Sequence, residues 1–146
     1  MIILGIDPGI GRTGWGIIEA TGGKFSVLQF GCIETFQTHT IGERLELLYE
    51  DICKLIKEQK PDALAIEEVF FNTNVKTAMV VGQARGVMLL AAQQHNVPIT
   101  VYTPLEVKMA VTGYGRAEKA QVGQMVKSLL HLTTIPKPDD TADALA

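Results

Sequence analysis

Four acidic side chains stand at the ends of elements, where carboxylates could act together. Asp7 closes the apolar run in ILGIDPG, and Glu67 closes a second apolar run in ALAIEEVF. Asp140 and Asp143 stand three residues apart in DDTADALA, so both face the same side of an expected helix. Carboxylates drawn together repel one another unless a divalent cation neutralises them. Oxygen ligands of this kind suit Mg²⁺ or Mn²⁺, and two such ions suit phosphodiester chemistry.

Each of these positions also has an ordinary structural interpretation. An Asp before Pro-Gly is usually a turn former, and two acids near a helix start usually complement the helix dipole. Glu67 and Glu68 together could be the solvated end of a strand. The ordinary interpretation is favoured for any one position taken alone. It fits poorly for all of them together, because they fall at the ends of adjacent strands and one helix.

The residues between the acids predict the elements that position them. Apolar runs and turn signals predict strands at 2–7, 13–19, 25–36, 63–67 and 99–102. Helical spacing and breakers predict helices at about 42–59, 74–95, 104–111 and 117–130, and a last one from Asp139 or Asp140. A right-handed crossover places the fourth strand parallel to and beside the first. We therefore expect an α/β fold, with a five-stranded mixed sheet of three antiparallel strands and then two parallel ones, flanked by helices. Asp7 and Glu67 then share one sheet edge.

Composition sets limits on the class of protein. The 146 residues, 47% hydrophobic and 20% charged, fit one domain over 1–146, whose last helix we expect to be cut short at Ala146. We expect no membrane-spanning run and no signal peptide. Cys32 and Cys53 have no motif spacing, which favours reduced thiols in a cytoplasmic protein.

The net charge of −3 alone argues against a nucleic-acid partner, but its distribution weakens that objection. Residues 1–70 carry 6 basic and 11 acidic side chains, and residues 71–146 carry 7 basic and 5 acidic ones. Once four acids bind metal, the remaining charge is +1. Bulk charge therefore does not exclude a nuclease.

Several motifs together resemble one family. LGIDPG…TGWGII, AIEEVFF, GQARGV, AEKAQV and DDTADALA occur in the order and spacing of RuvC-type Holliday junction resolvases. The resemblance implies an RNase H-like fold, a homodimer, and metal-dependent paired nicking of symmetric strands of a four-way DNA junction in recombination and repair. It implies Mg²⁺ or Mn²⁺, two ions per site, as cofactor, and the RuvA and RuvB branch-migration machinery as partners. The family's catalytic, metal-binding acids fall on Asp7, Glu67, Asp140 and Asp143, with Glu68 as a neighbour that either is not a ligand or lies in the outer shell.

Other residues are candidates for holding DNA. Phe70 and Phe71 leave a strand for a polar loop, so they are either core residues or a platform on which bases stack. The resemblance favours Phe70 as a wedge at the crossover, with Asn72, Thr73 and Asn74 nearby, and it places Lys108 and Lys119 near the scissile phosphate. Arg12, Arg85 and Arg116 are plausible phosphate contacts, although Arg85 could equally form an internal salt bridge.

The helix expected at 74–95 has more apolar surface than one core contact needs. We interpret one stripe as core and the excess, including Met79 and Met88, as a candidate dimer surface. A two-fold dimer supplies the two active sites that a symmetric junction requires.

Two other functions compete with a junction endonuclease. GIDPGIGRTGWGII also resembles the first phosphate loop of actin-like and sugar-kinase-like folds, but these need two domains and a second phosphate loop. A non-catalytic binder of branched DNA is the other alternative. It does not explain the full set of acids, because carboxylates that bind no metal would repel phosphate.

Overall fold

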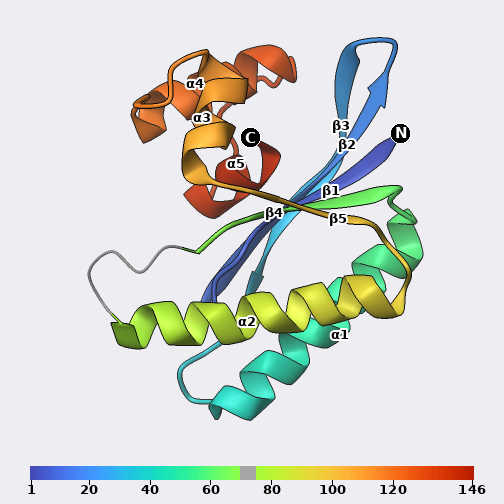
Figure 1. Cartoon of the computed structure of the whole chain (residues 1–146), viewed down its shortest axis with the longest axis vertical. Helices are drawn as coiled ribbons and strands as arrows, with labels where there is room; N and C mark the ends of the chain where they lie inside the picture. The colour runs from blue at the N-terminus through green and yellow to red at the C-terminus, as the bar shows by residue number, and fades with distance from the viewer. Residues whose placement is uncertain (70–74) are drawn as a thin grey trace.

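A mixed five-stranded sheet forms the centre of the molecule (Figure 1). The computed structural model describes residues 1–69 and 75–146. The strands stand in the order β3-β2-β1-β4-β5 and comprise β1 (Ile2–Asp7), β2 (Arg12–Thr21), β3 (Lys24–Glu34), β4 (Ala63–Glu67) and β5 (Ile99–Tyr102). The pairs β1–β2 and β2–β3 are antiparallel, whereas β1–β4 and β4–β5 are parallel. The predicted sheet, with the fourth strand beside the first, is confirmed.

The helices also follow the sequence prediction, with ends shifted by one or two residues. They are α1 (Ile41–Gln59), α2 (Val75–Gln94), α3 (Pro104–Thr112), α4 (Lys119–Leu129) and α5 (Asp139–Leu145). α1 and α3 begin at capping boxes, Thr40 with Glu43 and Thr103 with Glu106, in which each threonine and glutamate satisfies free N–H groups of the first turn.

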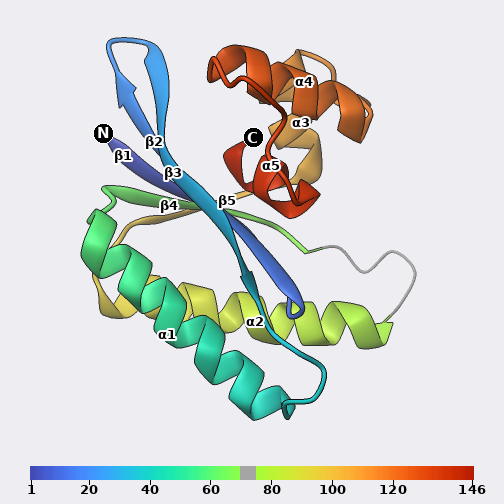
Figure 2. The ribbon, with the colours of Figure 1, turned by 180° about the vertical axis from the view of Figure 1, so that it is seen from behind.

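The helices cover the two faces of the sheet as separate groups. Figures 1 and 2 show α1 and α2 on one face and α3, α4 and α5 on the other. The larger core lies under α1 and α2, and its fully buried side chains include Leu4, Ile17, Leu48, Ile52, Leu64, Ile66 and Met88. A smaller cluster joins α4 and α5 through Val122, Val126 and Leu145. Met88 was expected on a dimer surface; that prediction is wrong, because its side chain is 0% exposed and fills the core.

α2 differs from expectation in its hydropathy. By length and composition alone, Val75–Gln94 is apolar enough to cross a membrane, although we predicted no such run. Its buried residues, among them Ala84, Met88 and Ala91, pack against the core beneath the sheet. Only 28% of the apolar stretch is buried, so α2 also presents apolar side chains outward.

Candidate active site

Asp7 and Glu67 end neighbouring parallel strands. The register pairs Ile6 of β1 with Ile66 of β4, so the two acids follow side by side at the same sheet edge. Both side chains are partly buried. Backbone hydrogen bonds of the sheet therefore set this half of the site, as the sequence predicted.

The loop after Asp7 is anchored by two buried threonines. The hydroxyl of Thr13, 0% exposed, donates to the Gly9 carbonyl at 2.7 Å. The hydroxyl of Thr35 donates to the Ile10 carbonyl, and its backbone N–H donates to the Gly11 carbonyl at 3.0 Å. These bonds fix the turn through which the chain leaves the Asp7 strand.

The second pair of acids reaches the sheet because α5 lies almost directly on strand backbone. Gly14 stands opposite Asp7 in the β1–β2 register. A Cβ added at Gly14 would lie 1.8 Å from the backbone oxygen of Asp140, and one added at Gly5 would lie 2.1 Å from that of Ala144. Only glycine permits this approach. The two glycines thus bring the N-terminal turn of α5 over the end of β1.

The two acids at the strand ends respond electrostatically to the other acids. The pKa of Asp7 is raised from 3.8 to about 7, first by burial and then by the charges of Asp143, Glu67 and Asp140. The pKa of Glu67 is raised by burial and by Asp143, against the lowering effect of Lys108 and Lys119. We call Asp7, Glu67, Asp140 and Asp143 the acid pocket. Mutual repulsion of this kind is what a bound cation relieves.

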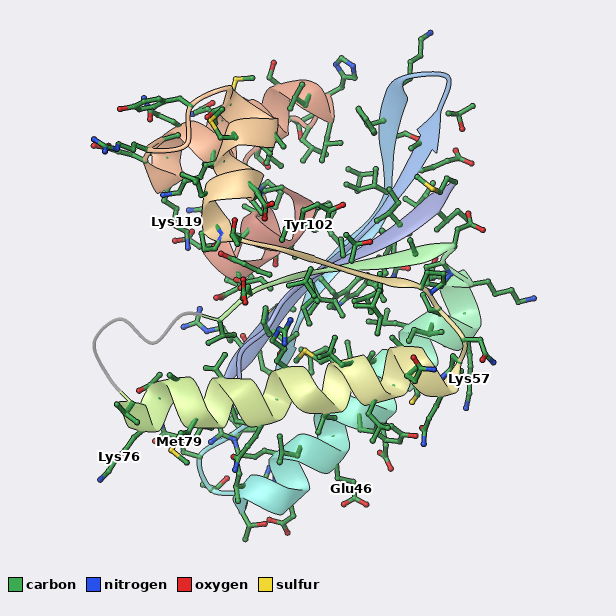
Figure 3. The ribbon with its side chains drawn as sticks, viewed as in Figure 1. Glu46, Lys57, Lys76, Met79, Tyr102 and Lys119 are labelled. Atoms are coloured by element: carbon green, nitrogen blue, oxygen red, sulfur yellow. The ribbon has the colours of Figure 1, made fainter. Side chains whose placement is uncertain are left out.

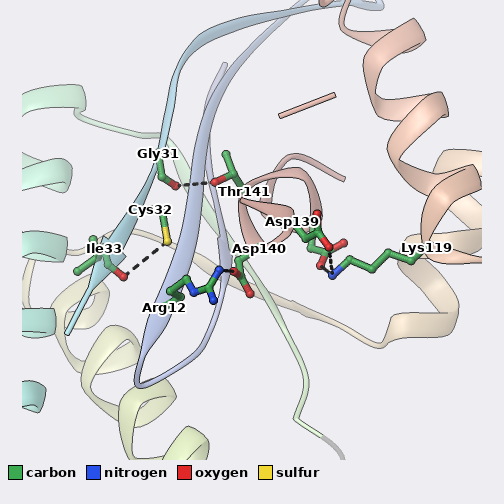
Figure 4. Close-up of polar contacts among 9 residues, drawn as sticks. Arg12, Gly31, Cys32, Ile33, Lys119, Asp139, Asp140 and Thr141 are labelled. Carbon is green, nitrogen blue, oxygen red and sulfur yellow. Dashed lines mark hydrogen bonds and ion pairs between the residues drawn. The ribbon is translucent and has the colours of Figure 1, made fainter. Parts of the chain in front are cut away.

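Lys119 is the counter-ion within the pocket. Its ammonium lies 2.7 Å from Asp143 and 3.8 Å from Asp139 (Figure 4). The hydrogen bond to Asp143 is the main reason that the pKa of Lys119 is raised. In residues 1–69 and 75–146, no three acidic, histidine or cysteine side chains stand close enough together to hold a metal ion. The four side chains suit a hard cation by their chemistry, since all are carboxylates. Lys119 must move away from Asp143 before the four carboxylates can surround such a cation.

The other predicted basic residues occupy different positions. The charge of Lys108 lowers the pKa of Glu67, and the guanidinium of Arg12 lies 4.0 Å from the carboxylate of Asp140. Arg85 donates its Nε–H to the backbone carbonyl of Glu67 at 3.2 Å, so it braces the end of β4. Arg116 is exposed between α3 and α4.

The predicted DNA wedge cannot be placed in the same way. Phe70, Phe71, Asn72, Thr73 and Asn74 lie outside the described residues. Glu68 is exposed, and its backbone N–H donates to the Tyr102 carbonyl at 2.8 Å.

Sequence reasoning missed two groups at this site. Asp139 and Lys137 had no assigned role, yet both lie beside the acids. Their signal was position, because Asp139 is the first residue of DDTADALA and Lys137 stands two residues before it. Gly5 and Gly14 were read only as parts of motifs, although glycine inside a strand is a sign of close backbone approach.

The comparison with known proteins decides the family. Residues 3–146 match the family described as crossover junction endodeoxyribonuclease RuvC. The chain belongs to this family. Proteins of that name from Alkaliphilus oremlandii and Ruminiclostridium cellulolyticum are 58% and 56% identical to it over 146 residues, covering all of this chain and 89% and 88% of theirs.

Solved RuvC structures agree with the assignment. Thermus thermophilus RuvC superposes with a TM-score of 0.91 at 36% identity, covering 99% of this chain and 89% of that one. A structure of T. thermophilus RuvC in complex with Holliday junction substrate matches with the same TM-score at 33% identity. The expected RNase H-like fold is therefore confirmed, and RuvC membership implies a divalent-metal nuclease.

Proposed function

We propose that this chain is a metal-dependent endonuclease that resolves four-way DNA junctions by paired nicks in recombination and repair. The acid pocket is the observation that supports this most directly. Burial and the charges of Asp143, Glu67 and Asp140 raise the pKa of Asp7 to about 7, so carboxylates from two strand ends and one helix act at one place. The match to RuvC proteins over the whole of this chain, and the junction complex of T. thermophilus RuvC, point to the substrate.

Each residue then has a role. Asp7, Glu67, Asp140 and Asp143 hold Mg²⁺ or Mn²⁺, two ions per site, which supply an activated water and stabilise the leaving oxygen when bound. Lys119 and Lys108 lie where their charge acts on the acids, and they face the phosphate that is cut. Arg85 keeps the end of β4 in place through its Nε–H, and Arg12 and Arg116 are exposed enough to meet phosphates.

Base recognition at the crossover is assigned to the segment after β4. Phe70 acts as the wedge on which a base stacks, with Asn72, Thr73 and Asn74 contacting the backbone around it. The support for these roles is the AIEEVFFNTN motif itself.

The outward apolar face of α2 supports a homodimer formed through this helix. Val75, Met79 and Leu90 are 66%, 58% and 51% exposed, although all are apolar. Between them, Gly82 and Gly86 have nothing within 4 Å of an added Cβ, so a second helix can approach closely. Leu90→Glu should convert the dimer to monomer in sedimentation, whereas Met125→Glu on α4 should not. A Leu90→Glu protein that stays dimeric would remove α2 from the interface.

The cellular setting is part of the same proposal. The protein acts in the cytoplasm with the RuvA and RuvB branch-migration machinery, as a single nuclease domain over 1–146. Cys32 and Cys53 are free thiols, as expected for that compartment.

The decisive experiment compares a synthetic four-way junction with linear duplex of the same sequence. Wild-type protein with Mg²⁺ should cut the junction in two symmetric strands and leave the duplex intact. Asp7→Asn, Glu67→Gln, Asp140→Asn and Asp143→Asn should each bind the junction but lower cutting by at least about 100-fold, as misplaced reacting groups do. Equal cutting of duplex and junction would refute junction selectivity, and a fully active variant would remove its residue from the site.

A further inference from the structure

A charged cavity lies beside the acid pocket. Its volume is about 540 Å³, and it is lined by Arg12, Lys119, Lys137, Pro138, Asp139 and Asp140. Figure 4 shows Arg12, Lys119, Asp139 and Asp140 at this place. The lining includes Asp140 but neither Asp7 nor Glu67, so the cavity adjoins the acids at the ends of the strands without containing them.

Two of its three cations are held by acids, and the third is not. Arg12 lies 4.0 Å from Asp140, and Lys119 lies between Asp139 and Asp143. Within the described ranges, Lys137 has no carboxylate within 4.0 Å. The side chains of Arg12 and Lys119 are each 58% exposed, so a ligand in solution can reach them.

This balance of charge changes when the acid pocket binds a cation. Asp140 and Asp143 are then occupied by the metal and no longer neutralise Arg12 and Lys119. The cavity is left with three positive side chains and one remaining carboxylate, Asp139. It therefore attracts an anion more strongly once the acids are occupied.

We propose that this cavity is a second phosphate site, in which Arg12 and Lys137 hold a phosphate next to the one that is cut. The proposal rests on the proposed junction nuclease activity and extends it. A phosphodiester group suits the cavity because arginine binds it through paired N–H groups and lysine through a point charge. Because the cavity adjoins the acids, the phosphate it takes is a neighbour in the same strand. Occupancy of this site sets the position of the scissile bond over the acid pocket.

The test uses junctions with a neutral methylphosphonate at the phosphate on either side of the cut. Wild-type protein, Lys137→Ala, Arg12→Ala and the control Lys57→Ala are titrated with each junction in Ca²⁺ in place of Mg²⁺, so that binding is measured. Lys57 is a suitable control because it lies at the far end of the molecule from Lys119 (Figure 3).

One of the two methylphosphonates should weaken wild-type and Lys57→Ala binding, and should weaken Lys137→Ala and Arg12→Ala binding less, because each of these two variants has already lost one of the two cations that hold this phosphate. Lys137→Ala should also reduce the slope of log affinity against log salt by about 0.9, the value for one phosphate contact. Without divalent ion, the wild-type preference for the charged phosphate should shrink. Equal losses in wild type and Lys137→Ala, or no loss in wild type, would overturn the second site.

A separate arm keeps the two proposals apart. Unmodified junction is incubated with wild-type protein and Mg²⁺. Cutting without the Lys137-dependent effect would leave the nuclease function standing and remove the second phosphate site. If no cutting occurs, the nuclease function fails, while the Ca²⁺ titrations still report on the cavity.

Discussion

The two halves of the acid pocket are held in place by different forces. Asp7 and Glu67 stand at the ends of adjacent strands, where ladder hydrogen bonds fix the register on both sides. Asp140 and Asp143 stand on the seven-residue helix α5, too short to be stable alone, so packing must hold it. Its place depends on contact with the backbone at Gly5 and Gly14. Backbone hydrogen bonds of the sheet thus fix the strand half, whereas close packing of α5 against Gly5 and Gly14 fixes the helix half.

The halves also differ in how their charge is managed. Asp7 is buried and repelled by its neighbours, which raises its pKa to about 7. Asp143 instead has the Lys119 ammonium at 2.7 Å. In the strand half, a bound cation would therefore relieve the repulsion on Asp7. In the helix half, Asp143 is already paired with the ammonium of Lys119.

The largest effect should come from separating the halves. In Gly14→Ala, the new Cβ would meet the Asp140 backbone oxygen, so α5 must move away from β2. A displacement of about 1 Å at reacting groups can cost about 100-fold in rate, and we expect at least that loss in junction cutting. Gly42→Ala is the control, since nothing lies within 4 Å of its added Cβ. The measurement is single-turnover nicking alongside thermal unfolding. An active Gly14→Ala protein would mean that α5 tolerates the shift.

The same contrast explains what the sequence could predict. The position of the strand half could be predicted because near-continuous apolar runs, typical of buried strands, end at Asp7 and Glu67. The crossover rule then places these two strands side by side. The ends of α1 and α2 followed from the breakers Pro61 and Pro98, within two residues.

The helix half was not accessible in the same way. The i, i+3 spacing put Asp140 and Asp143 on one side of a helix but did not say where that helix lies. That information resides in glycines of distant strands, whose effect depends on three-dimensional packing. The same limit explains Met88 and Lys119, because neither the covered side of α2 nor the partner of a surface lysine can be read from spacing.

The strand half should show itself in the pH dependence of stability. The unfolded chain loses the Asp7 proton near pH 4, whereas the folded chain keeps it until about pH 7. The folded state binds more protons in that window, so the free energy of unfolding without metal should fall as pH rises from about 4 to about 7. Asp7→Asn should flatten this fall in denaturant titrations, and Mn²⁺ affinity of the wild type should rise over the same range as the competing proton leaves. A wild type whose metal-free stability rises there would contradict the buried charge of Asp7.

The helix half should respond to loss of its internal cation. In Lys119→Met, Asp143 no longer pairs with an ammonium and is free to bind metal, so Mn²⁺ should bind more tightly. An ion pair this exposed contributes up to about 1 kcal/mol, which corresponds to about fivefold in affinity. Calorimetric titration of Mn²⁺ measures the change, with Lys127→Met on the same helix as control. Weaker Mn²⁺ binding in Lys119→Met would show that Lys119 supports the metal site instead of competing with it.

The smallest effects compare one buried threonine from each half. Thr13, beside the Asp7 loop, donates to the Gly9 carbonyl at 2.7 Å, whereas Thr141 of α5 donates to the Gly31 carbonyl at 3.3 Å. Both side chains are 0% exposed, and valine replaces either with little change of shape. Since a net hydrogen bond contributes about 1 kcal/mol, Thr13→Val should lose about that much unfolding free energy and Thr141→Val less, because its bond is longer. Urea titrations of both variants give the two values. A larger loss from Thr141→Val would mean that this bond, as well as close packing on glycine, holds α5 to the sheet.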